Sequence, residues 1–155
     1  MLNRTYDDQD CSIARALEIL GERWTFLIIR DVFNGRRRFD QLQDGLGVAR
    51  NVLAARLARL IDEGILERRA YRERPARYEY LLTEKGIELW PVLMAMLEWG
   101  DRHVAGADGP PVVVHHKFCE GVVDGRGICG ECGQRLEARD VYAVRPKASR
   151  PTAAA

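Results

Sequence analysis

The sequence lacks several features that would place it in a large class of proteins. It contains no apolar run near the ~18 residues that a membrane-spanning helix needs. Residues 1–8 are polar and acidic, which is unlike a secretory signal. These two absences argue against a membrane partner, and they lead us to expect a protein that works in the cytoplasm.

Signals of catalysis are missing as well. The sequence contains no glycine-rich phosphate loop and no G-x-S-x-G elbow. The three histidines, His103, His115 and His116, do not lie beside a nucleophile motif, and the carboxylates are scattered along the chain. We therefore do not expect an enzyme.

The net charge of +1 conceals an uneven distribution of charge. Residues 1–35 carry four arginines against six acidic residues, whereas residues 36–77 carry eleven arginines against six. A basic surplus in one stretch predicts a surface that faces phosphates, although a solvated helix face explains the charge alone equally well. With 155 residues, 46% of them apolar, the chain suits one globular domain with a small appendage.

Apolar residues at helical spacing, followed by two alternating segments, give this domain its pattern. The predicted helices cover 11–20, 22–33, 39–43, 48–63 and 84–103, and the predicted strands cover 65–71 and 78–82. Asp10 is the expected N-cap of the first helix and Gly21 its expected end. Pro91 should kink or split the last helix, because proline lacks the amide that the preceding turn needs.

This order of elements predicts a mainly α fold with a small β-hairpin wing, a winged helix-turn-helix, that binds duplex DNA. The helix over 48–63 is the expected groove-reading helix, with its leucines inward and a smooth outer side made by Ala54 and Ala55. Arg50 and Asn51 can offer paired hydrogen bonds to guanine and adenine edges. The remaining expected DNA contacts are arginines. Arg56 and Arg59, beside the reading face, would contact phosphates, and Arg72, Arg74 and Arg77 on the wing would contact the backbone or the minor groove. Arg36, Arg37 and Arg38 would hold the duplex from its other side.

A family resemblance extends over residues 11 to about 104. The residues that carry it are Cys11-Ser12-Ile13, Leu17, Leu20-Gly21, Arg23-Trp24-Thr25, Leu27, Ile28, Arg30, Gly35, Arg38-Phe39, Leu42, Val52-Leu53, Arg56-Leu57, Leu60, Gly64, Tyr78-Glu79-Tyr80, Leu82-Thr83, Gly86, Leu89, Pro91-Val92-Leu93 and Trp99-Gly100. This pattern resembles the HxlR-type winged-helix transcription regulators, relatives of the MarR group. The resemblance implies a homodimer joined through its N-terminal and long C-terminal helices, which binds a pseudo-palindromic operator and represses transcription. One departure is Ala49, where family members often carry a hydroxyl residue.

Four cysteines require separate explanations, and disulfides are the less expected use in a chain without a signal peptide. Cys11 falls near the start of the first helix, where the helix N-terminus stabilises a thiolate and nearby aspartates oppose it. The resemblance implies a sensor of oxidants or electrophiles at this position, and a small apolar filler is the alternative.

The tail contains two ligand pairs at the spacing of a zinc knuckle. His116 and Cys119 form a His-x2-Cys pair, and Cys129 and Cys132 form a Cys-x2-Cys pair. Such a set can hold a structural zinc ion in tetrahedral coordination. His115 competes for the fourth position, and a metal-free tail is the alternative.

These observations predict four regions and leave two other functions open. The regions are a DNA-binding and dimerisation domain over 1–105, a linker over 106–111, a zinc-binding tail over 112–145 and a disordered end over 146–155. A protein-interaction module that no longer binds DNA is one alternative. A small-molecule sensor, with a ligand near Trp24, Trp90 and Trp99, is the other.

Overall fold

The computed structural model describes residues 5–6 and 9–146. Most of the segment expected to be disordered, residues 147–155, lies outside the described residues. The chain divides into two compact units, Met1–Glu88 and Leu89–Ala155. The last long helix, which we expected within the DNA-binding domain, is grouped with the tail in the second unit and contributes Met94 to its core. The linker expected over 106–111 stays a prediction.

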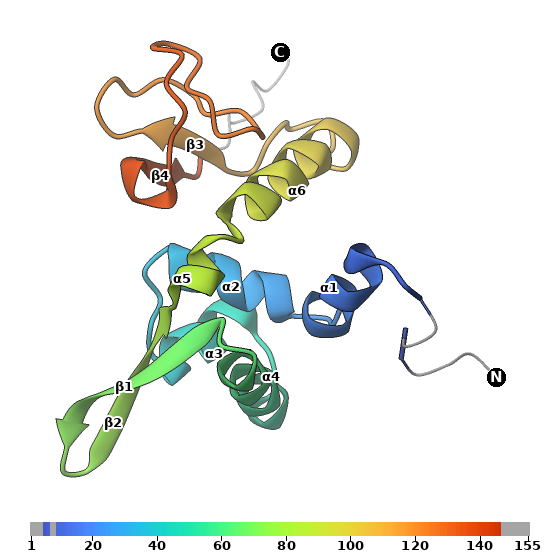
Figure 1. Cartoon of the computed structure of the whole chain (residues 1–155). Helices are drawn as coiled ribbons and strands as arrows, with labels where there is room; N and C mark the ends of the chain where they lie inside the picture. Colours follow the sequence, from blue (N-terminus) through green and yellow to red (C-terminus); the bar gives the residue numbers. More distant parts are fainter. Residues whose placement is uncertain (1–4, 7–8, 147–155) are drawn as a thin grey trace, which may run out of the picture. The chain divides into compact units, whose positions relative to one another are not determined.

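The first unit has the order of elements that the sequence predicts (Figure 1). Its helices are α1 (Ser12–Leu20), α2 (Thr25–Phe33), α3 (Phe39–Leu46), α4 (Arg50–Asp62) and α5 (Glu84–Ile87), and its hairpin is made of β1 (Leu66–Glu73) and β2 (Ala76–Leu82). The N-cap of α1 is Cys11 and not Asp10, whereas Gly21 ends the helix as expected.

The core of the first unit forms where the apolar stripes of α2, α3 and α4 meet. The fully buried side chains are Ile28 and Ile29 of α2, Leu42 of α3 and Leu53, Leu57 and Leu60 of α4. Each such side chain stabilises the fold by about 1.5–3 kcal/mol relative to its exposed state. Helix α3 ends at Gly47, whose φ of 63° is a left-handed conformation that glycine adopts without strain. The chain can therefore turn sharply into α4.

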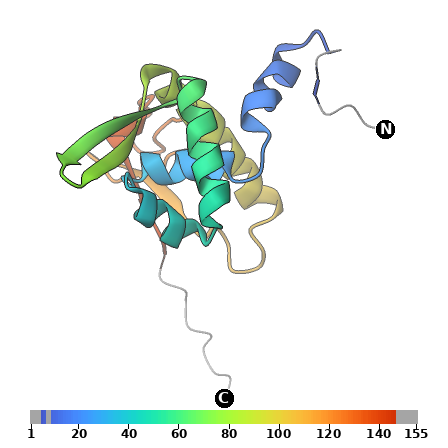
Figure 2. The same ribbon diagram turned by 90° about the horizontal axis from the view of Figure 1, so that it is seen from below.

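The hairpin is antiparallel, and it extends from the helices as a two-stranded arm (Figure 2). Leu66 pairs with Leu82 at its base, and the register shifts between Ala70 and Arg72 near its tip. Leu66 is buried, whereas the rest of β1 is exposed. The arm therefore adds little to the core and is free to contact another molecule.

Proline divides the predicted long helix into α5 and α6 (Trp90–His103), one of the two outcomes that we expected for Pro91. Pro91 stands in the first turn of α6, where its missing amide costs nothing. Thr83 caps α5, since its hydroxyl accepts a hydrogen bond from the Gly86 amide at 3.1 Å.

The second unit packs the tail against one side of α6. Strands β3 (Val113–His116) and β4 (Val141–Val144) pair in an antiparallel sheet, and the 3-10 helix η1 (Ala138–Asp140) precedes β4. Its small core contains Met94 of α6 and five tail residues: Val114, Val123, Cys129, Leu136 and Val141. None of the helices in the described part of the chain is long and apolar enough to cross a membrane.

Candidate nucleic-acid interface and metal centre

Helix α4 presents two different sides. Leu53, Leu57 and Leu60 are at most 2% exposed, whereas Ala54 and Ala55 lie open on the other side. The side chains of the open side are short, so another molecule can approach the helix backbone closely. This is the geometry that insertion into a major groove needs.

The polar residues at the start of α4 are accessible. Arg50 and Asn51 are both exposed, and the Arg50 guanidinium lies 4.7 Å from the centre of the Phe39 ring. Ala49 is the N-cap, so Asn51 does not cap the helix. The amide of Asn51 is therefore available to a partner.

Two further arginines of α4 are engaged in ion pairs. Arg56 is only 28% exposed and contacts Glu22 at 2.8 Å, and Arg59 contacts Glu63 at 2.9 Å. The pair with Glu22 connects α4 to the segment before α2. Arg56 is thus partly committed to the fold, whereas Arg59, at 52% exposed, is more accessible.

The basic loop before α3 contains three arginines, of which one forms an ion pair with a buried residue and two are exposed. Asp31 is buried, and Arg36 contacts its carboxylate at 2.8 Å. Arg37 and Arg38 are exposed, and the Arg37 carbonyl accepts a hydrogen bond from the Tyr80 amide of β2 at 2.7 Å. The loop runs beside β2, where Arg38 forms an isolated antiparallel bridge with Glu79. That this loop holds the duplex from the other side stays a prediction.

The arginines at the tip of the hairpin are exposed. Arg72 donates a hydrogen bond to the Arg74 carbonyl at 3.2 Å. Within the described part of the chain, Arg74 and Arg77 form no ion pair, although acidic residues are present in the same hairpin. The tip therefore offers positive charge that the protein itself does not neutralise.

Two helices carry exposed apolar stripes. Ile13 and Leu17 of α1 are 70% and 43% exposed. Val92, Met96 and Trp99 of α6 are 42%, 50% and 62% exposed. Both stripes follow helical spacing, so each helix presents an unpartnered apolar side.

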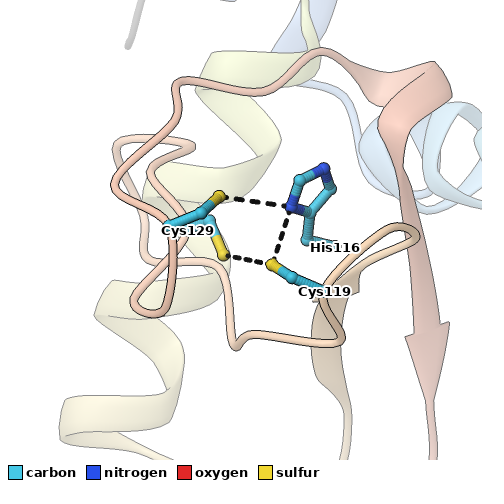
Figure 3. A group of neighbouring side chains, drawn as sticks. His116, Cys119 and Cys129 are labelled. Atoms are coloured by element: carbon cyan, nitrogen blue, oxygen red, sulfur yellow. Dashed lines mark hydrogen bonds between the residues drawn. The ribbon is translucent and has the colours of Figure 1, made fainter.

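The tail brings both predicted ligand pairs together. The ligand atoms of His116, Cys119, Cys129 and Cys132 all lie within 4.8 Å of one another. His116 Nδ1 is 3.0 Å from the Cys119 sulfur and 3.5 Å from the Cys132 sulfur, and the sulfurs of Cys119 and Cys129 are 3.4 Å apart (Figure 3). Ligands of a tetrahedral zinc ion lie roughly 3.5–3.8 Å from one another. The donor set and its geometry therefore fit a zinc ion with little adjustment.

The electrostatics of the cluster favour thiolate at its buried member. The backbone amide of Cys132, helped by that of Glu131 and by Cys119 and His116, lowers the pKa of Cys129 to about 6, although burial opposes the shift. The Gly121 amide lowers the pKa of Cys119, but the neighbouring thiols and burial outweigh it and leave that pKa raised. Where thiols crowd together in this way, a cation bound between them would stabilise their thiolate form.

The neighbouring histidine is not part of the cluster. His115 Nδ1 lies 2.7 Å from the Glu120 carbonyl oxygen, and its ring stacks on Tyr142 at 5.7 Å. Alternate residues of β3 point to opposite faces, so His115 faces away when His116 faces inward. The structure therefore selects His116 from the two candidates.

Comparison with known proteins assigns the chain to a family. A model of the HxlR-like helix-turn-helix family matches residues 19–108. The chain belongs to that family. It is 43% identical over 130 residues to uncharacterized HTH-type transcriptional regulators of Mycobacterium bovis and Mycobacterium tuberculosis, an alignment that covers 84% of this chain and 82% of each relative.

Solved structures support the same assignment. PA1607, crystallised as a candidate transcription factor, superposes with a TM-score of 0.70 at 34% identity over 91% of this chain and 95% of its own. The reduced form of the transcriptional regulator YodB from B. subtilis superposes with a TM-score of 0.54 at 33% identity, over 64% of this chain and 100% of its own. This HxlR-like protein is thus a transcriptional regulator with a helix-turn-helix DNA-binding fold, and its relatives are not enzymes.

The match with PA1607 reaches beyond the family segment. Coverage of 91% of the chain requires most of the second unit to superpose as well. The redox regulator HypR, in contrast, superposes over 59% of this chain with a TM-score of 0.56 at 28% identity. The alignment with PA1607 therefore includes much of the second unit, whereas the alignment with HypR covers a smaller share of the chain.

Two further wing arginines were not among the expected DNA contacts, and Cys11 lies near a helix start as the sequence analysis predicted. Arg68 and Arg69 of β1 are exposed, and the Arg68 guanidinium lies 4.3 Å from the centre of the Tyr78 ring. Both lie in the segment 65–71 that the sequence predicted as a strand of the hairpin, and this is the signal that could have identified them. Cys11 is exposed at the N-cap of α1, and the amides of Ala14 and Ile13 lower the pKa of its thiol.

Proposed function

We propose that this protein is a homodimeric, sequence-specific repressor that reads duplex DNA with α4. The observation that carries the proposal is the contrast between the two sides of α4, leucines buried and alanines open. A helix with this contrast is held firmly by its own core and remains free to enter a groove. The protein-interaction alternative gives no reason for a smooth outer side.

Base recognition is assigned to the first turn of α4. Arg50 can form two hydrogen bonds to a guanine edge, and Asn51 can form two to an adenine edge. Ala54 and Ala55 set the depth at which the helix lies. In this proposal Arg59 contacts a phosphate beside this turn. Arg56 contacts a phosphate only if the DNA displaces Glu22 from its ion pair with Arg56.

Affinity without sequence preference is assigned to the wing and to the loop beside it. The exposed arginines of this surface are Arg37, Arg38, Arg68, Arg69, Arg72, Arg74 and Arg77. Each phosphate that such a residue neutralises releases counterions, so binding should weaken steeply as salt rises. Arg36 is assigned to the same surface indirectly, since its ion pair with Asp31 holds the loop.

Dimerisation is assigned to the apolar stripes of α1 and α6. Large exposed apolar side chains at helical spacing are costly in water, and a second copy that covers them removes this cost. A two-fold dimer would bind half-sites about one helical turn apart, or a small multiple of that spacing. Repression follows where such an operator overlaps a promoter and the dimer excludes the polymerase.

Zinc is the proposed structural cofactor of the tail, held by His116, Cys119, Cys129 and Cys132. The tail contributes five residues to the core of the second unit, which is a small core for its length. A metal that crosslinks two segments supplies stability that such a core does not. An oxidant acting at Cys11 is a second proposed input, supported by its exposure and its lowered pKa.

Selection from genomic DNA tests the proposed function. Purified full-length protein is incubated with genomic fragments, bound fragments are sequenced, and the best site is footprinted. We expect a two-fold symmetric footprint and, on a template with that site over a promoter, reduced transcription in vitro. Fragments enriched no more than random duplex would contradict sequence-specific binding. Increased transcription from the same template would contradict repression while leaving DNA recognition intact.

A further inference from the structure

The second unit contains a cavity that neither the DNA interface nor the metal cluster uses. Its volume is about 240 Å³, and residues from α6 and from the tail line it. The α6 side includes Met94 and Leu97, and the tail side includes Val112, Val114 and Val123. These walls are aliphatic, as the walls of ligand sites usually are, and the volume lies below the common range of ~300–1,000 Å³. The cavity therefore suits a small molecule.

Three carboxylates are part of the same lining, and they differ in their partners. Glu98 pairs with Arg102 at 3.2 Å, and Asp124 pairs with Arg126 at 2.8 Å. Asp101 is half-buried, and among the described residues it forms neither an ion pair nor a hydrogen bond through its side chain. Burial raises the pKa of Asp101, because the carboxylate loses solvation without gaining a cation. The cavity thus has one negative charge that the protein leaves uncompensated.

We propose that this cavity binds a small organic cation, an ammonium group on a compact apolar body, with Asp101 receiving the ammonium group. The apolar body would cover Met94 and the valines of the tail, which removes their surface from water. The positive charge of the ammonium group would compensate the Asp101 carboxylate for the solvation that it loses on burial. This ligand is the effector class of the regulator proposed above, but the binding itself requires neither DNA nor the wing.

Two methionines on α6, one in the cavity lining and one outside it, can report where a ligand binds. Met94 lines the cavity and is 2% exposed, whereas Met96 does not line it and is 50% exposed. Protein labelled with [13C-methyl]methionine gives one methyl resonance for each. A ligand in the cavity should move the Met94 resonance and leave the Met96 resonance in place.

The experiment titrates the labelled full-length protein with benzylamine, and separately with benzyl alcohol and benzoate, at millimolar concentrations. These probes share a ring and differ in charge. We expect saturable movement of the Met94 resonance with benzylamine, and binding of the other two that is weaker by roughly two- to fivefold, the range of a partly exposed charge pair. Asp101→Asn should reduce benzylamine affinity by the same factor. Asp108→Asn, an exposed aspartate outside the lining, should leave it unchanged.

Several results would overturn the proposal. Equal affinity for benzylamine and benzyl alcohol would show that charge plays no part. Unchanged affinity in Asp101→Asn would remove Asp101 from the site, and movement of Met96 alone would place the ligand elsewhere. No movement of either resonance would show that the cavity binds no such cation. Because DNA is absent throughout, none of these results bears on whether the protein is a repressor.

Discussion

Gly121 lies directly against the cluster of His116 and the three cysteines: a Cβ atom added at Gly121 would stand 2.5 Å from the sulfur of Cys129. Real Cβ atoms do not approach another atom so closely. The same added atom would stand 2.8 Å from the side chain of Glu131, within the Cys129–Cys132 turn. The absence of a side chain at Gly121 therefore lets the two ligand pairs approach one another.

Gly121→Ala should weaken zinc binding by forcing Cys129 out of position. We expect at least a tenfold loss of affinity, as follows when a residue that orients metal ligands is changed. Competition with a chromogenic zinc chelator measures it. Gly100→Ala is the matched control, since an added Cβ there meets only Val104 at 3.8 Å. Equal zinc affinity in both variants would show that Gly121 has no part in the site.

Zinc should be present at about one ion per chain, and its removal should unfold the tail. Elemental analysis of protein purified without chelator measures the first, and the dispersion of the tail's backbone amide resonances measures the second. His116→Ala should lose the metal, whereas His115→Ala should keep it, because His115 contacts Glu120 and Tyr142 and not the cysteines. Well under one zinc per chain in the unaltered protein would end the metal proposal.

Base-reading and backbone-contacting arginines should respond differently to substitution. Arg50→Ala or Asn51→Ala should cost roughly 1–3 kcal/mol on the preferred operator and much less on random duplex. Arg74→Ala should weaken binding to both alike and reduce the salt dependence by about one counterion. Fluorescence anisotropy at several salt concentrations measures both. If the two classes of variant behave identically, α4 is not the reading helix.

A charge on the apolar stripe of α6 should dissociate the dimer. Trp99→Glu places a carboxylate where the proposed interface excludes water, and sedimentation should then report a monomer. Ile87→Glu is the control, because Ile87 is 48% exposed on α5 and belongs to neither stripe. A dimer that survives Trp99→Glu would move the interface away from this side of α6.

Alkylation of Cys11 should begin at lower pH than alkylation of an ordinary cysteine. The amides of Ala14 and Ile13 lower the pKa of its thiol, so the reactive thiolate forms earlier as pH rises. Peptide mapping after brief iodoacetamide treatment across a pH series gives the midpoint. In denatured protein the helix start is lost, and the midpoint should move upward. Equal midpoints in the two states would remove the physical basis for sensing at Cys11, and an unchanged peroxide response in Cys11→Ser would exclude the sensing itself.

Local patterns were sufficient to predict most of the elements. The spacing of Leu53, Leu57 and Leu60 indicated which side of α4 is buried, and Pro91 indicated where the last helix divides. Errors occurred at the ends of elements. Asp10 was expected to cap α1, whereas Cys11 does so, because several polar residues before a helix can satisfy the same pattern.

Contacts between distant residues could not be predicted from such patterns. Arg56 appears in sequence as one more basic residue of α4, but it pairs with Glu22, and Arg36 pairs with the buried Asp31. These ion pairs neutralise two of the positive charges that the sequence analysis assigned to the DNA-facing surface. The lining of the cavity beside Asp101 does not include Trp24, Trp90 or Trp99, which the small-molecule-sensor alternative placed near a ligand.

The sequence by itself determined the order of helices and strands, the buried side of α4 and the two ligand pairs of the tail, because periodicity and spacing act over one or two turns of chain. Only the tertiary structure decided which arginines are free and that α6 packs with the tail. It also confirmed that His116, which the spacing favoured over His115, joins the cysteines. Those outcomes depend on which distant segments pack together, and close packing tolerates one arrangement where the sequence pattern allows several.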